Sequence, residues 1–66
     1  MRLTVELTGI TKGDIVLFQN MNNDRLTVRV QTSNDYAKIT ARGSYDELIP
    51  VIMQATSYRS YSIHLN

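Results

Sequence analysis

The segment from Ser44 to Thr56 constrains the fold of this chain more than any other. Ser44 and Glu47 stand three residues apart ahead of an apolar run, and this capping-box spacing is typical of a helix start. On a helical wheel the segment divides into one broad apolar face and one polar face, so its period is helical. The apolar face holds Tyr45, Leu48, Ile49, Val51, Ile52, Ala55 and Thr56, and the polar face holds Asp46, Glu47, Pro50 and Gln54.

Four other segments alternate between apolar and polar side chains, which is the period of a strand with one buried face. They cover residues 2–8, 25–31, 36–42 and 58–65. The turn-forming residues 32–35 separate the second segment from the third, so these two strands should form a hairpin. The expected inward side chains are Leu3, Val5, Leu7, Leu26, Val28, Val30, Ala37, Ile39, Ala41, Tyr61, Ile63 and Leu65.

Residues 11–23 fit two different structures. Thr11 and Asp14 have capping-box spacing ahead of the apolar residues 15–18, which indicates a helix. Gly13 and the β-branched residues after it are poor helix formers, so the same four apolar residues could instead form a buried strand. A shift of thirty-three positions aligns Thr11 with Ser44 and Asp14 with Glu47. This internal similarity favours the helix.

The resulting element order is strand, helix, strand, strand, helix, strand. We therefore predict an α+β fold, with an antiparallel sheet that has both helices on one face, in the βαββαβ arrangement called ferredoxin-like. The alternative is a four-stranded meander followed by one helix and a fifth strand. In either case the 66 residues are expected to form a single domain, residues 1–66.

Composition bears on the cellular compartment of the protein. The chain has no cysteine and no apolar run of the ~20 residues that a membrane-spanning helix requires. Its first residues already alternate as a strand, unlike a signal peptide. These features predict a cytoplasmic protein that neither enters a membrane nor depends on disulfides.

The side chains that carry catalysis are few and scattered. The single histidine, His64, has no second histidine or acidic cluster predicted beside it, and a lone histidine of this kind is usually a surface residue. The acids fall mainly at helix starts and turns, and the glycines do not form a phosphate-binding loop. We therefore expect no enzymatic activity, no cofactor and no bound metal.

The net charge of +1 conceals an uneven distribution of charge. Five of the seven basic residues occupy outward positions of the predicted strands, with two tyrosines and a single acid. Such a face could meet a partner. The candidate interaction residues are Arg25, Arg29, Tyr36, Lys38, Arg42 and Tyr58.

Two functions fit this face. The first is a small, non-enzymatic binding or regulatory protein whose partner, another protein or a second copy, docks on the open sheet face or on an edge strand. The size of the chain would suit an accessory or inhibitor protein of a mobile element. The second is a module that binds single-stranded RNA or DNA, with bases stacked on the tyrosines and phosphates held by the basic side chains. The chain lacks the RNP1 pattern of common RNA-binding sheets.

Overall fold

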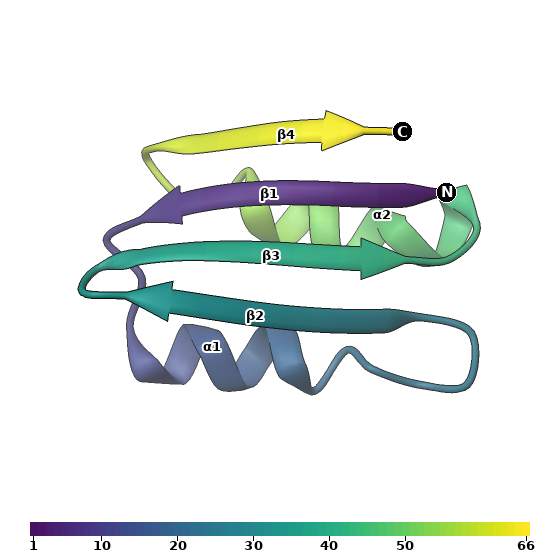
Figure 1. The fold of residues 1–66 in the computed structure, drawn as a ribbon, viewed down its shortest axis with the longest axis horizontal. Coiled ribbons are helices and arrows are strands. Elements are labelled where there is room, and N and C mark those ends of the chain that lie inside the picture. Colours follow the sequence, from purple (N-terminus) through teal and green to yellow (C-terminus); the bar gives the residue numbers. More distant parts are fainter.

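A computed structural model describes all residues 1–66 and shows a four-stranded sheet with two helices on one face (Figure 1). The strand order is β2-β3-β1-β4, and every neighbouring pair is antiparallel. This is the ferredoxin-like arrangement, which confirms the predicted α+β fold; the meander alternative is wrong. The elements are β1 (Arg2–Thr8), α1 (Lys12–Gln19), β2 (Thr27–Ser33), β3 (Tyr36–Arg42), α2 (Tyr45–Ala55) and β4 (Tyr61–Leu65).

The ambiguous segment forms α1 because its first turn is capped from both sides. The Thr11 hydroxyl accepts a hydrogen bond from the Asp14 N–H over 3.2 Å, and the Asp14 carboxylate accepts one from the Thr11 N–H over 2.9 Å. These bonds satisfy amide groups that lack partners at a helix start. The helix is held to the core by one fully buried side chain, Phe18.

Helix α2 buries only part of its predicted apolar face. Leu48, Val51 and Ala55 are fully buried, whereas Tyr45 and Ile49 remain exposed. Its N-cap is the predicted Ser44, whose hydroxyl accepts a hydrogen bond from the Glu47 N–H at 3.4 Å. Pro50 lies on the exposed side of this helix, as predicted. Neither helix is long and apolar enough to cross a membrane.

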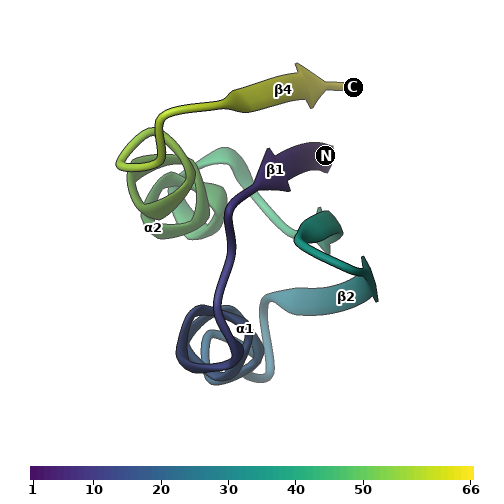
Figure 2. The ribbon, with the colours of Figure 1, turned by 90° about the vertical axis from the view of Figure 1, so that its left-hand side faces the viewer.

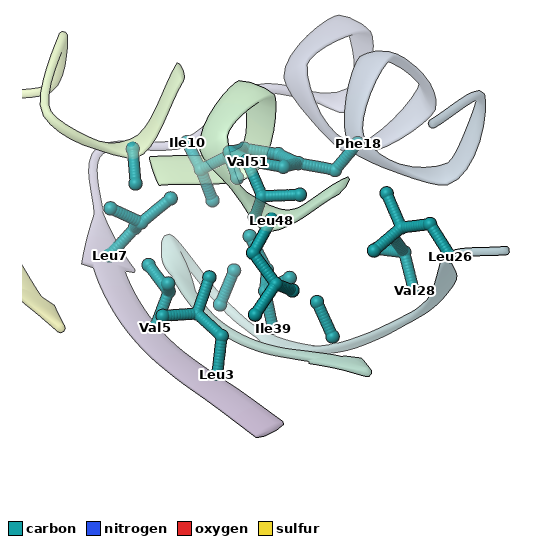
Figure 3. Close-up of a cluster of buried hydrophobic side chains, with 13 residues drawn as sticks. Leu3, Val5, Leu7, Ile10, Phe18, Leu26, Val28, Ile39, Leu48 and Val51 are labelled. Carbon is teal, nitrogen blue, oxygen red and sulfur yellow. The ribbon is translucent and has the colours of Figure 1, made fainter. Parts of the chain in front are cut away.

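The core lies between the sheet and the helices (Figures 2 and 3). Its largest contribution comes from the two central strands, β1 and β3, whose inward side chains are all fully buried. No buried side-chain nitrogen or oxygen lacks a hydrogen-bond partner. The core is composed of Leu3, Val5, Leu7, Ile10, Phe18, Leu26, Val28, Ala37, Ile39, Ala41, Leu48, Val51 and Ala55.

The observed strand ends differ from the predicted ones at three places: both ends of β2, which continues to Ser33 through two of the predicted turn residues, and the start of β4. Strand β2 begins at Thr27, two residues after the predicted start at Arg25, and β4 begins at Tyr61 and not at Tyr58. The β2–β3 hairpin closes through a two-residue turn in which Asn34 has a φ of 58°. Asparagine tolerates this left-handed conformation better than most residues, because its short side chain bonds locally.

Candidate functional site

The sheet face opposite the helices is polar and is formed by alternate residues of all four strands. We call it the open face. It carries four basic side chains and one acidic side chain, so a nearly neutral protein does present one basic surface. Across the strands its residues form four rows: Thr27, Arg42 and Arg2; Arg29, Thr40, Thr4 and His64; Gln31, Lys38, Glu6 and Ser62; and Ser33, Tyr36 and Thr8.

Three arginines gather at one end of the open face, and we call them the arginine cluster. Arg42 on β3 lies directly opposite Arg2 on β1, and Arg29 on β2 is the diagonal neighbour of Arg42. Like charges placed directly opposite one another destabilise a sheet, and diagonal neighbours are only about 7–8 Å apart. The cluster is therefore a place where an anionic group would relieve repulsion.

Tyr36 lies toward the other end of the open face, where its hydroxyl is already engaged. It donates a hydrogen bond to the Glu6 carboxylate at 2.6 Å. This hydrogen bond and, to a smaller extent, burial and the negative charge of Glu6 raise the pKa of Tyr36 above its ordinary value. Glu6 is the only acid on the face, and this bond directs it away from the arginine cluster.

Tyr58 does not lie on the open face, so the predicted placement is wrong. It precedes β4 and packs against the core, where its ring stacks on Phe18 with centroids 6.2 Å apart. Its hydroxyl accepts a hydrogen bond from the Gln54 side chain at 3.2 Å, and burial raises its pKa. Alternation continues through residues 58–65, but the turn after α2 carries Tyr58 to the helix side of the sheet.

The remaining candidates divide between the sheet and a loop. Arg29, Lys38 and Arg42 lie on the open face as predicted. Arg25 is exposed in the loop before β2, so its predicted place on the strand is wrong. The loop is shaped by Asn23, whose side-chain oxygen accepts hydrogen bonds from the N–H groups of Arg25 and the residue after it. Sequence alternation could not reveal this side-chain turn.

The two edges of the sheet differ in how their backbone groups are satisfied. On β2, the Asn22 side chain bonds to both outward-pointing groups of Val28: its amide donates to the Val28 oxygen at 2.9 Å, and its oxygen accepts from the Val28 N–H at 2.7 Å. Helix α1 also runs beside this edge (Figures 1 and 2). The β2 edge is therefore partly closed by the chain itself.

The β4 edge has no such cover, and no element lies beyond it (Figures 1 and 2). Arg2 and Asn66 exchange two backbone hydrogen bonds, at 3.1 and 2.8 Å. Because bonded and non-bonded pairs alternate along antiparallel strands, Tyr61, Ile63 and Leu65 belong to the non-bonded pairs of β1 and β4. Their N–H and C=O groups therefore point to the free edge.

The same three residues direct their side chains to the helix side of the sheet, as predicted, but α2 does not cover them fully. Tyr61 is 48% exposed and Leu65 is 42% exposed. The neighbouring side of α2 is apolar as well. Gln54 donates a hydrogen bond to Tyr58, which stacks on Phe18 of α1, so this side of α2 faces α1. Tyr45 and Ile49 lie on the opposite side of α2 and therefore point toward the β4 side of the sheet.

We call the combined surface the β4 flank: Tyr45, Ile49, Tyr61, Ile63 and Leu65. Sequence reasoning did not single it out, because alternation shows which way a side chain points and not how far a helix extends over it. An uncapped sheet edge bordered by exposed apolar side chains is the arrangement that binds another strand.

Other kinds of site have little support in the geometry. No group of three or more histidine, aspartate or glutamate side chains is placed to hold a metal, and the surface has no pocket. The lone histidine, His64, is exposed on the open face with its Nε2 3.3 Å from the Ser62 hydroxyl. Comparison of the chain with protein families, characterised proteins and solved structures finds no match.

Proposed function

We propose that this protein is a small, non-enzymatic binding or regulatory protein that binds a protein partner along the edge of β4. One observation carries the proposal. Tyr61, Ile63 and Leu65 direct their backbone N–H and C=O groups to the free edge, and the same three residues have exposed or half-exposed apolar side chains. An added strand would gain main-chain hydrogen bonds from the edge, and the apolar side chains would give the contact its specificity.

The β4 edge supports a protein partner better than the open face does. The open face consists mainly of threonine, serine, arginine and lysine side chains, which remain well solvated without a partner. By contrast, natural edge strands usually carry a lysine, a proline or a bulge that discourages pairing. The five residues of β4, Tyr61–Leu65, include no lysine and no proline.

Site-specific photo-crosslinking in extracts of the native host tests this function. A photoreactive phenylalanine analogue at Tyr61 reports on the β4 edge, and the same analogue at Tyr36 is the matched control on the open face. We expect protein adducts from position 61 and few from position 36. Adding Leu65→Lys should abolish the adducts, because it introduces a charge into the β4 flank. Adducts of equal yield at both positions, or only at position 36, would refute binding along β4.

The arginine cluster favours a second candidate function, binding of single-stranded RNA or DNA on the open face. Arg2 and Arg42 lie opposite one another, and phosphates would neutralise both. The face offers a single tyrosine, Tyr36, and no phenylalanine or tryptophan, where strand-based readers of single strands use several aromatic side chains for stacking. Electrostatic contacts would therefore dominate, and affinity would fall steeply with salt.

Titration of a labelled oligonucleotide at several salt concentrations tests the second function. Arg42→Gln should weaken binding and reduce the salt slope by about 0.7, the value for one phosphate contact with a single strand. Arg59→Gln is the matched control, because Arg59 is also exposed but lies in the loop before β4. Equal effects of the two substitutions, or no binding at low salt, would exclude the open face as a nucleic-acid surface.

A further inference from the structure

We propose that the occupant of the β4 edge is a second copy of this chain, bound by antiparallel β4–β4 pairing about a twofold axis at Ile63. This inference rests on the proposed function and names its partner. The axis would stand perpendicular to the sheet, so the two four-stranded sheets would join into one continuous sheet of eight strands with all helices on the same side.

The backbone of β4 fits a copy of itself in one register. With Ile63 at the axis, Ile63 faces Ile63 of the second copy, and Tyr61 faces Leu65. These are the positions whose N–H and C=O groups point to the free edge. Each facing pair can exchange two hydrogen bonds, as hydrogen-bonded antiparallel pairs do. All outward groups of the strand are then satisfied at once.

The side chains agree with the same register on both faces of the sheet. On the helix side, an aromatic ring meets an aliphatic side chain in each Tyr61–Leu65 pair, a favourable cross-strand combination. On the open face, Ser62 lies opposite His64 of the second copy, so polar groups meet polar groups. The strand contains no side chain that is always charged, so two copies meet without repulsion between like charges.

Helix α2 extends the contact beyond the strands. Because the axis is perpendicular to the sheet, the α2 helices of the two copies lie on the same side, each with Tyr45 and Ile49 toward the β4 edge. Their exposed apolar surface would then meet across the axis. A strand pair alone buries less area than a standard interface of about 800 Å² per partner, so this second contact is needed for a stable dimer.

The opposite edge of the sheet is a poor site for the same pairing. The outward groups of Val28 are bonded to Asn22, and α1 runs beside the strand. Association through β4 is isologous, because each copy offers the same edge to the other, so it stops at two copies. A closed dimer follows, and not a fibre.

Sedimentation or light scattering over a range of concentrations measures the association directly. We expect a monomer–dimer equilibrium whose mass rises from 7.5 kDa toward twice that value. Leu65→Lys and Tyr61→Glu should each weaken the dimer at least tenfold. Because Tyr61 faces Leu65 of the other copy, the double variant places opposite charges together twice and should recover most of the loss. A double variant no better than the worse single one would overturn the register.

Cysteine scanning tests the axis, since the chain contains no cysteine of its own. Residue 63 is the only position of β4 that faces itself in this register. Facing Cα atoms of a hydrogen-bonded pair are about 5.5 Å apart, within the range that a disulfide spans. On mild oxidation Ile63→Cys should form a covalent dimer, whereas Ser62→Cys and His64→Cys should not. Equal crosslinking at all three positions would refute the axis.

The outcomes separate this proposal from the function on which it rests. A monomer at every concentration overturns the dimer. If that monomer still forms adducts with another protein from position 61, the β4 edge binds a partner and only the identity of the partner is wrong. If position 61 forms no adduct at all, the proposed function fails with the dimer. Adducts formed only between copies of this chain, together with a mass that approaches twice that of the monomer, support both the proposed function and the dimer.

Discussion

Replacing Asn22 with alanine would remove the side chain that closes the β2 edge. Asn22→Ala deletes the two hydrogen bonds to the Val28 backbone, at 2.9 and 2.7 Å, and a third to the Gln19 oxygen at 3.0 Å. A typical intramolecular hydrogen bond contributes about 0.5–1.5 kcal/mol net. The Val28 groups lie at an edge and can reach water once the side chain is gone, which lowers the cost of leaving them unpaired.

These terms give a loss of about 2–3 kcal/mol in the free energy of unfolding. That is large for 66 residues, whose total stability should be about 3–10 kcal/mol. With a urea m-value of about 1 kcal/mol per M, the unfolding midpoint should fall by about 2–3 M. Amide exchange gives a local readout. The Val28 N–H should lose its protection, whereas the N–H of buried Ile39, which lies between two strands, should keep its protection once the lower global stability of the variant is allowed for.

Two matched variants make the test sharp. Asn20→Ala has the same change of side chain in a nearby exposed residue, and it should shift the stability by less than about 0.5 kcal/mol. Asn22→Asp keeps the acceptor for the Val28 N–H but loses the donor to the Val28 oxygen, so its stability should fall between wild type and Asn22→Ala. If Asn22→Ala and Asn20→Ala unfold at the same urea concentration, Asn22 does not hold the edge.

Three further predictions concern the core, a helix cap and the open face. Phe18→Ala should lower the free energy of unfolding in urea by about 3–5 kcal/mol, because it empties a fully buried site. Leu17→Ala, at a residue that is 44% exposed, should lower it by less than about 1 kcal/mol. Similar losses for the two variants would contradict the assigned buried face of α1. Hydrogen bonds from the Thr11 backbone and then from its side chain lower the pKa of Asp14. The stability that Asp14 contributes is therefore present above its unfolded pKa and lost as pH falls through its folded pKa. Asp14→Asn should therefore flatten the acid decline in thermal melts, and an unchanged decline would rule out this origin. Glu6→Gln should lower the pKa of Tyr36 toward its ordinary value, as NMR titration of that ring can show, and an unmoved titration would exclude Glu6 as the cause.

The fold could be predicted because its signals are local. The capping box at Thr11 and Asp14 is contained within four residues, and it decided correctly against the poor helix propensities nearby. Alternation likewise identified every buried position of β1 and β3, since both strands lie in the middle of the sheet and are covered by helices. Here periodicity and burial agree.

The candidate surfaces could be predicted only in part, since they depend on contacts between distant residues. Tyr58 continues the alternation of β4, yet it turns away to stack on Phe18, forty positions earlier in the chain. Asn22 closes an edge that exists only once the strand order is known. The exposure of Leu65 reflects where α2 stops covering the sheet, and no local pattern records that.

The position of β1 in the sheet has a consequence for folding kinetics. Both of its partners come from the other half of the chain: Leu3 pairs with Ala41 on one side and with Leu65 on the other. Only the β2–β3 hairpin is local, so the central strand is fixed by closing two long loops. High contact order of this kind slows folding. The rate-limiting event should be the docking of β1 between β3 and β4, and until then the apolar side of each strand is open to aggregation.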